Sequence, residues 1–322
     1  MDKSKPPANS PPKGVRAWTT WPYRLGCPVW ACKQWPNSVY PEKTRADSYL
    51  DWYSRCFPTV EGNSTFYSVP PIRTWEKWCD QVDAGFRFCF KFPRLISHDL
   101  QLIGCQEPLK NWLNALEILA KRSRLGPTFL QLAPSFSSRQ LDSLAQFLQS
   151  LPHDWPWAVE VRHPDWFDGS PWGQRLDELL ATYSIDRVLF DSRPLNSMQA
   201  HDATESASQR RKPKLPLCVS VTGKRPMVRL IGRNDVTEVS TYWDEWANRI
   251  ADWIAEGLEP WVFTHAPDDA FAPELARALH QRIIDRSPSI EPLPAWSDLM
   301  PPTDPSSDQG PRDKGPVQLR LF

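Results

Sequence analysis

The chain has 322 residues, and its 38 lysines and arginines balance 38 aspartates and glutamates, so the formal net charge is zero. This balance argues against a protein that coats nucleic acid or membrane by bulk electrostatics, although it allows a local basic patch. The 40% hydrophobic and 24% charged content is typical of a globular protein, and the 13 glycines exclude a collagen-like chain.

Short apolar segments alternate with longer amphipathic segments along the chain. The apolar segments predict eight strands, at residues 24–30, 59–63, 86–91, 127–133, 156–162, 186–191, 227–231 and 260–264. The amphipathic segments predict helices at about 46–56, 71–82, 107–124, 137–150, 171–183, 241–256 and 270–285. This alternation predicts an α/β fold, a closed TIM-barrel-like (β/α)8. An open doubly wound sheet is the main alternative, but the chain has no glycine-rich nucleotide-binding motif.

Three segments lie outside this alternation. Residues 1–16 and 299–322 are rich in proline and poor in apolar residues, so we expect disordered tails on either side of a barrel domain at 17–298. Residues 192–226, between strands six and seven, have no clear helical period and predict an irregular insertion. It is either a solvated surface segment or a phosphate-contacting loop, and its basic residues are Arg210, Arg211, Lys212, Lys214, Lys224 and Arg225.

The sequence also bears on location. Its seven cysteines form no Cys-x-x-Cys pair and predict buried free thiols rather than disulfides. The first residues contain no apolar run of the kind that a secretory signal needs, and no apolar stretch reaches the about 18 residues of a membrane span. We therefore expect a cytoplasmic protein that does not bind membrane.

Polar residues gather at the carboxyl ends of the predicted strands, which is where barrel enzymes place their active sites. Glu160 and Arg162 share one face of their strand because side chains alternate. Buried charges need partners, so these groups form either a polar pocket or a structural ion-pair network that fills the barrel. The catalytic candidates are Glu61, His98, Glu160, His163 and Asp191. The candidates for substrate binding are Asn63, Tyr67, Lys91, Gln131, Arg162, Trp166, Arg229 and His265.

This set of residues permits three chemistries. Glu61 and Glu160 are suited to acid and base roles on a glycosidic bond. Carboxylates and imidazoles together are suited to hold a divalent metal that activates water against a phosphodiester, although the spacing of Glu160 and His163 is a weak metal signature. Lysine and arginine are suited to clamp a phosphorylated or carboxylated ligand. The sequence identifies no particular metal or cofactor.

Several of these residues lie in blocks that follow one another in a recognisable order. The blocks are Glu61-Gly-Asn63-Ser-Thr-Phe66-Tyr67, Phe90-Lys91-Phe-Pro, Leu130-Gln131-Leu-Ala-Pro134 and Val159-Glu160-Val-Arg162-His163. This succession, within residues 24–285, resembles the DUF72 family of YecE-like proteins. The resemblance implies a TIM-barrel-like fold but no reaction, because the family's activity is not established. Two blocks depart from the family: strand seven has Ile231 in place of a common histidine, and strand eight ends Thr264-His265 in place of Asn-Asn.

The last five residues, Gln318-Leu319-Arg320-Leu321-Phe322, resemble the pentapeptide by which bacterial polymerases and repair proteins bind the DNA sliding clamp. In this reading Gln318 fixes the register, while Leu319, Leu321 and Phe322 fill apolar pockets and the proline-rich segment acts as a tether. The alternative is an apolar end that folds back onto the barrel. We therefore expect the sliding clamp as a partner, and DNA as a ligand.

These features favour a hydrolase of phosphodiester or damaged-DNA type that serves DNA maintenance. Two alternatives stay open. One is a carbohydrate-active hydrolase or isomerase in which Trp30, Trp35, Trp166 and Tyr67 stack on sugar rings. The other is a non-catalytic, clamp-associated binding protein whose polar barrel interior is structural.

Overall fold

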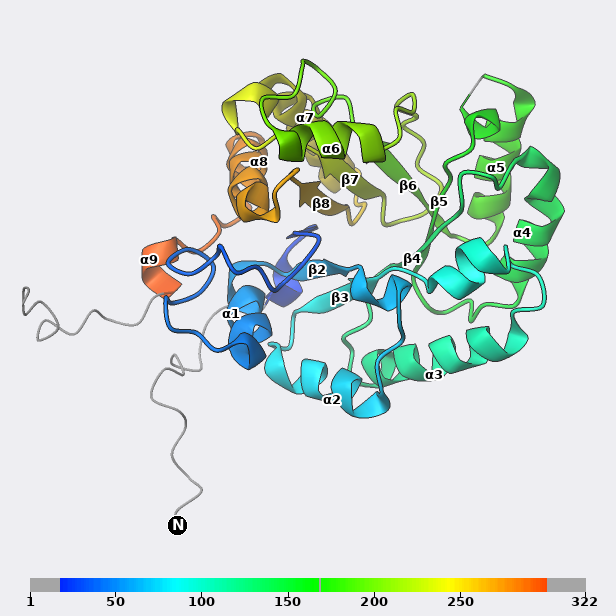
Figure 1. Cartoon of the computed structure of the whole chain (residues 1–322), viewed down its shortest axis with the longest axis horizontal. Helices are drawn as coiled ribbons and strands as arrows, with labels where there is room; N and C mark the ends of the chain where they lie inside the picture. The colour runs from blue at the N-terminus through cyan, green and yellow to red at the C-terminus, as the bar shows by residue number, and fades with distance from the viewer. Residues whose placement is uncertain (1–17, 168, 300–322) are drawn as a thin grey trace, which may run out of the picture.

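The computed structural model of the chain describes residues 18–167 and 169–299 (Figure 1). The two predicted tails lie outside these ranges, apart from Leu299, which is buried against the domain. The predicted clamp-binding residues Gln318, Leu319, Leu321 and Phe322 also lie outside the described residues.

In the described ranges, eight strands overlap the predicted segments, with β1 ending four residues short of its segment and β8 running one residue past its own, and all of their pairings are parallel. They are β1 (Arg24–Gly26), β2 (Thr59–Gly62), β3 (Arg87–Phe90), β4 (Thr128–Gln131), β5 (Trp157–Glu160), β6 (Asp186–Asp191), β7 (Met227–Ile231) and β8 (Trp261–His265). Six of them form one curled sheet in the order β1-β8-β7-β6-β5-β4, and β2 pairs with β3 in a second, two-stranded sheet.

The continuous closed barrel that the sequence predicts is replaced by this half-barrel and its separate pair of strands. The early strands are short, since β1 to β4 have three or four residues each, and the ladder is interrupted on both sides of the β2–β3 pair. Between β3 and β4 the ladder is reduced to isolated bridges from Phe88 to Leu125 and from Lys91 to Phe129. Between β1 and β2, Glu61 N donates to Cys27 O at 3.0 Å. The fold is therefore an α/β half-barrel of six strands with a two-stranded neighbour.

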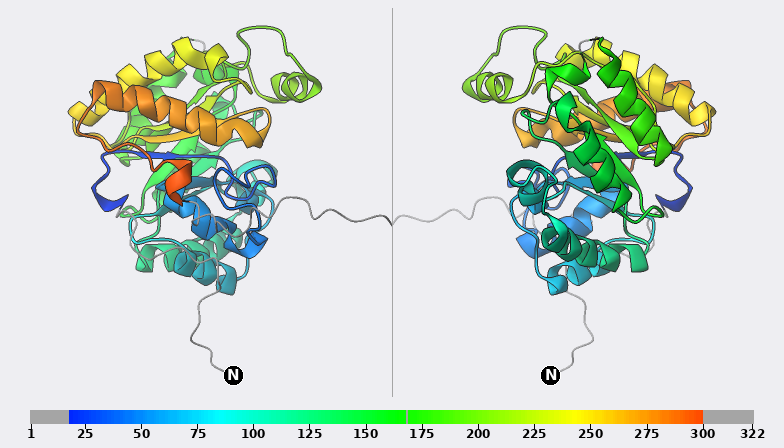
Figure 2. Two further views of the ribbon diagram at one scale, coloured as in Figure 1. Left: turned by 90° about the vertical axis from the view of Figure 1, so that its left-hand side faces the viewer. Right: turned by 90° about the vertical axis from the view of Figure 1, so that its right-hand side faces the viewer.

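The helices lie outside the strands (Figures 1 and 2). Seven correspond to predicted segments: α1 (Tyr49–Cys56), α2 (Ile72–Gln81), α3 (Gln106–Lys121), α4 (Leu141–Gln149), α5 (Pro171–Thr182), α7 (Ser240–Ala255) and α8 (Ala272–Arg286). A short helix, α9 (Trp296–Leu299), follows them. The amphipathic pattern explains their packing, because Leu109, Trp112 and Leu116 of α3 are all buried. None of the helices in the described ranges is long and apolar enough to cross a membrane.

The insertion between β6 and β7 contains a helix that the sequence pattern did not reveal, α6 (Ala203–Arg211). Figure 2 shows it standing out from the helices around the strands. The Asp202 side chain caps it by accepting from Glu205 N at 2.8 Å. It has no apolar face, and instead the buried Glu205 carboxylate accepts from Arg233 Nη2 at 2.6 Å. A helix held by polar contacts leaves no hydrophobic period in the sequence, which explains the missed prediction.

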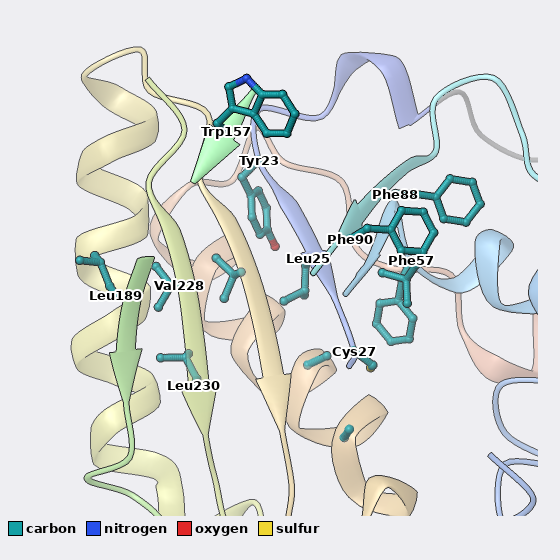
Figure 3. Close-up of a cluster of buried hydrophobic side chains, with 14 of the residues drawn as sticks. Tyr23, Leu25, Cys27, Phe57, Phe88, Phe90, Trp157, Leu189, Val228 and Leu230 are labelled. Atoms are coloured by element: carbon teal, nitrogen blue, oxygen red, sulfur yellow. The ribbon is translucent and has the colours of Figure 1, made fainter. Parts of the chain in front are cut away.

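Apolar side chains fill two layers. Residues on the outer face of the strands pack against the helices, and Figure 3 shows Leu189, Val228 and Leu230 among them. A second, smaller cluster on the inner face is Cys89, Phe129, Ala158, Val188, Met227, Trp261 and Phe263. The seven cysteines are free thiols, as the sequence predicts. The inner cluster shows which residues of each strand face inward. The same alternation then identifies the inward residues at the carboxyl ends of the strands.

Candidate functional site

Strand alternation places a set of polar side chains inside the curled sheet. Two residues after the inward Met227, Arg229 takes the same face of β7. By the same period, Glu160 follows Ala158 on β5, and Lys91 follows Cys89 at the end of β3. The polar set therefore stands directly on the inner apolar cluster, at the carboxyl ends of the strands.

Arg229 is the centre of a buried ion-pair network. Its Nε and Nη2 donate to the two oxygens of Glu61 at 2.8 and 2.7 Å, and its Nη1 donates to Glu160 Oε2 at 2.7 Å. Glu160 also accepts from Arg162. Burial by itself would raise the pKa of Glu61, but Arg229 and His265 hold that pKa well below its usual value. Against the same effect of burial, Arg162 and Arg229 lower the pKa of Glu160. Both carboxylates are therefore ionised and engaged.

Three of the predicted substrate-binding residues complete this network. Asn63 Nδ2 donates to Glu61 Oε1 at 2.8 Å, and Gln131 Oε1 accepts from Arg162 Nη2 at 3.2 Å. His265 Nε2 lies 3.2 Å from Glu61 Oε2. Burial lowers the pKa of His265 to about 4, so the ring is neutral near pH 7 and its Nε2–H donates to the carboxylate. These side chains orient the charged groups.

Lys91 differs from the two arginines beside it. Its side chain is 9% exposed, and its Nζ lies 3.8 Å from the centroid of the Phe66 ring. In the described part of the chain, this ammonium has no hydrogen bond and no ion pair within contact distance. Burial and the charge of Arg229 lower its pKa to about 7. Among the described residues, the Lys91 amine therefore has no charged partner, whereas the neighbouring Arg162 and Arg229 are paired with carboxylates.

A cavity of about 660 Å³ opens over these residues. Tyr67, 81% exposed, stands at its wall, and His98 packs the edge of its ring on Phe66 with centroids 5.0 Å apart. Burial and the charge of Lys91 lower the pKa of His98 to about 4. Most of the lining charges are positive: Lys91, Arg162, Arg210, Arg211, Lys212 and Arg229.

Several lining residues are not among the predicted site residues. Arg210, Arg211 and Lys212 end α6 and reach the cavity, and burial together with Arg229 lowers the pKa of Lys212 to about 8. Asp269 also lines the cavity, and burial raises the pKa of its carboxyl group. Arg210, Arg211 and Lys212 belong to the basic residues of the insertion at 192–226. The interpretation of that insertion as a phosphate-contacting loop would have placed them at the site.

Five predicted site residues do not line the cavity: Glu61 and Glu160 are fully buried in the ion-pair network, and Asp191, His163 and Trp166 have other partners. Asp191 faces the helices, where its Oδ2 accepts from Arg193 Nη2 and from Trp246 Nε1, each at 2.8 Å. His163 Nδ1 accepts from Asp165 N at 3.2 Å in the turn after β5. Trp166 is buried, with its Nε1 donating to Phe136 O at 3.0 Å. These contacts give Asp191, His163 and Trp166 structural partners.

The arrangement bears on the metal hypothesis as well. Across residues 18–167 and 169–299, no group of three or more His, Cys, Asp or Glu side chains is placed to hold a metal ion. Arg229 lies between Glu61 and Glu160 and takes the oxygens that a cation would need. The chemistry available from this chain's own groups is anion binding by the cations, with proton transfer by Lys91 and the orientation of water by His98.

The comparisons with known proteins agree with the motifs. Among the relatives, the UPF0759 protein YecE of Escherichia coli strain K12 is 35% identical over 271 residues, which cover 84% of this chain and 96% of that protein. The UPF0759 protein YunF of Bacillus subtilis strain 168 is 28% identical over 159 residues, which cover 47% of this chain and 56% of that protein.

Solved structures show the same likeness at the level of the fold. A DUF72 family protein of Enterococcus faecalis V583 has a TM-score of 0.61 and 19% identity, with coverage of 82% of this chain and 98% of that chain. One from Thermotoga maritima MSB8 has a TM-score of 0.58 and 22% identity, with coverage of 82% and 99%. The model of the family described as "Protein of unknown function DUF72" matches residues 24–297. The chain therefore belongs to the DUF72 family.

Proposed function

We propose that the protein binds an organic phosphate in this cavity and acts on it as a hydrolase of phosphodiester or damaged-DNA type. The observation that carries the proposal is the charge of the site. Six cations line the cavity, and the carboxylates beside them are Glu61, Glu160 and Asp269, which leaves an excess of three positive charges (six minus three) when all are ionised. An excess of this size attracts a phosphate group, which arginine and lysine bind through charge-assisted hydrogen bonds.

The proton-transfer groups differ from those that the sequence predicts. Glu61 and Glu160 are locked in ion pairs, whereas Lys91 and His98 share the Phe66 ring and line the cavity. His98, neutral near pH 7, can orient an attacking water through a ring nitrogen, since a pKa of about 4 makes it a weak base. Lys91, with its pKa lowered to about 7, is suited to give a proton to the leaving oxygen.

The carbohydrate alternative receives less support. Trp35 and Trp166 are buried, and Trp30 packs edge-on against Trp78 with centroids 5.1 Å apart. Of the four aromatic residues considered for stacking, Tyr67 lines the cavity. Glycoside hydrolysis also requires a protonated carboxylic acid, and the pKa values of Glu61 and Glu160 are both lowered.

Calorimetry with a matched pair of variants tests the binding step. Lys212 lines the cavity, and Lys214 lies two residues further along the same insertion without lining it. We expect the affinity for inorganic phosphate, dTMP and a short single-stranded oligonucleotide to fall by about tenfold in Lys212→Gln and by less than about twofold in Lys214→Gln. Equal losses, or no binding by the wild-type protein, would contradict the proposal.

A panel of nicked, abasic and single-stranded DNAs tests catalysis. Each DNA is incubated with the protein in EDTA, Mg²⁺ or Mn²⁺, and cleavage is read on denaturing gels. We expect cleavage of at least one substrate by the wild-type protein and its loss in His98→Gln. The absence of cleavage in every combination, alongside normal phosphate binding, would leave the cavity as a binding site and contradict the hydrolase.

We further propose that the protein binds the bacterial sliding clamp through Gln318, Leu319, Leu321 and Phe322. The support is the sequence pattern, in which an amide precedes spaced apolar residues. Calorimetry with a purified clamp should show binding by the full chain and none after Leu321→Ala plus Phe322→Ala. Arg320→Ala is the control, because the pattern leaves that position free. An unchanged affinity in the double variant would refute this assignment.

A further inference from the structure

We propose that Lys91 is a nucleophile that forms an imine with the aldehyde or ketone of a ligand that also carries a phosphate ester. The inference rests on the proposed function for the phosphate part of the ligand, and it names the chemical class of that ligand.

The position of Lys91 gives its nitrogen access to a ligand in the cavity. The lysine stands at the carboxyl end of β3, and it lines the cavity on a side chain that is 9% exposed. Its neighbours Arg162 and Arg229 donate to Gln131, Glu61 and Glu160. Among the described residues, the Lys91 nitrogen has no such carboxylate or amide partner and lies over the face of Phe66 instead. A lysine that served only to neutralise a carboxylate would be paired with one.

Taken together, the groups around Lys91 favour its neutral, nucleophilic form. Arg229 and Arg162 oppose its protonation, Glu160 and Glu61 favour it, and burial outweighs each of them. His98, which shares the Phe66 ring with Lys91, is neutral near pH 7. The outcome is a pKa of about 7, so about half of the molecules carry a free amine at that pH. Desolvation and neighbouring cations are the general means of activating a lysine toward carbonyl carbon.

The cations that line the cavity around Lys91 favour a ligand that also carries a phosphate group. Arg162 and Lys212 line the same cavity as Lys91, so the proposed ligand would carry a phosphate for these cations and a carbonyl carbon for the Lys91 nitrogen. In the reaction the neutral amine attacks the carbonyl carbon, so that a carbon–nitrogen bond forms and the carbonyl oxygen takes up a proton. The carbinolamine then loses water. Amine and carbonyl thus yield an imine and one water, with no oxidant or reductant.

A phosphorylated carbonyl compound has two sources: an abasic site in DNA, with its aldehyde between two phosphates, and a small sugar phosphate. Borohydride trapping distinguishes them. The full chain is incubated with abasic DNA, with glyceraldehyde 3-phosphate or with glyceraldehyde, then reduced, weighed by intact-mass spectrometry and mapped by peptide analysis. We expect at least one phosphorylated compound to label Lys91 about tenfold more than glyceraldehyde does. Label on abasic DNA alone assigns the nucleic acid, and label on the small compound assigns the sugar phosphate.

Two variants and one independent measurement complete the experiment. Lys91→Arg retains the charge and should lose the label, while Lys214→Arg, outside the cavity lining, should keep it. Peptide mapping of the wild-type protein gives the site without any variant. An adduct spread over other lysines, or absent, overturns the inference. Calorimetry with inorganic phosphate separates the two failures: phosphate binding without an adduct refutes the imine alone, and an adduct without phosphate binding or phosphate preference refutes the proposed function.

Discussion

Arg229 and Glu61 form a two-point ion pair between the two sheets, with Nε and Nη2 donating to the two carboxylate oxygens at 2.8 and 2.7 Å. Arg229 belongs to β7 of the six-stranded sheet, and Glu61 belongs to β2 of the separate pair. The two residues are 168 positions apart in the chain. Where the backbone ladder is interrupted, this contact joins the sheets through side chains.

Removal of Arg229 should therefore be costly. Arg229→Met leaves Glu61 and Glu160 buried without their shared partner, and losses of about 3–5 kcal/mol are typical when one member of a buried ion pair is removed. Lys121→Met is the control, because Lys121 and Glu117 form an exposed pair worth about 0–1 kcal/mol. Urea unfolding at neutral pH measures both variants. Similar losses in the two would show that the buried network contributes nothing special.

Acid should destabilise the fold through two imidazoles, those of the buried His265 and the half-buried His98. Burial lowers the pKa values of His265 and His98 to about 4. The unfolded chain takes up protons near pH 6.5, so the free energy of unfolding should fall as pH drops from about 6.5 to 4, by at most about 1.4 kcal/mol per pH unit for His265 and by less for His98, which solvent screens. His265→Gln should reduce this slope, and His201→Gln, whose side chain is 60% exposed, is the control. Denaturant unfolding at several pH values tests it; an unchanged slope in His265→Gln would count against a neutral buried ring.

Lys91 should affect stability in the opposite pH range. Its folded pKa of about 7 lies below the ordinary value of 10.5. Between these values the unfolded chain holds a proton that the folded chain lacks, so the free energy of unfolding of the wild type should rise with pH. Lys91→Met lacks this term, and its stability relative to wild type should therefore decline between about pH 7 and pH 10. Urea unfolding at both pH values measures the difference. A constant difference would mean that Lys91 keeps an ordinary pKa.

The second junction between the sheets allows a steric test. A Cβ on Gly26 would lie 2.2 Å from the carbonyl oxygen of Thr59, where β1 meets β2. Gly26→Ala must shift the backbone there, and we expect a loss of more than about 2 kcal/mol. Gly257→Ala is the control for the alanine itself: it has a φ of +80° with nothing within 4 Å, and should cost about 1–2 kcal/mol from backbone strain alone. Thermal and urea unfolding rank the two, and a smaller loss for Gly26→Ala would refute the close approach.

Much of the fold could be predicted because its signals are local. The alternation of strands and helices, and the shared face of Glu160 and Arg162, follow from side-chain periods of 2 and 3.6. Closure of the barrel could not be predicted, because it depends on how far short strands such as β1 continue their ladders. The inward face of β6 was equally hidden. Val188, Leu189 and Phe190 are all apolar, so alternation gives no parity, and Asp191 faces the helices.

The candidate site was also predicted where its signals are local in the sequence and missed where they depend on tertiary contacts. Glu160, Arg162 and Arg229 were found because charges inside apolar strands need an interior partner. His163 and Trp166 follow a strand end in sequence, but the turn after β5 directs them to neighbouring loops. Lys212 was missed as a site residue because its place over the cavity depends on α6, which is anchored by a contact between Glu205 and Arg233 that no periodicity encodes.

The insertion that carries α6 also bears on the distance over which the cavity attracts an anion. Arg210, Arg211 and Lys212 are a local concentration of charge on a chain whose net charge is zero. Such a group has little field at long range, and at physiological ionic strength its attraction fades within a screening length of about 8 Å. For the anionic ligand proposed above, the attraction would act only once the ligand lies within about 8 Å of α6. The rate of encounter would then depend on whatever brings the ligand to that distance.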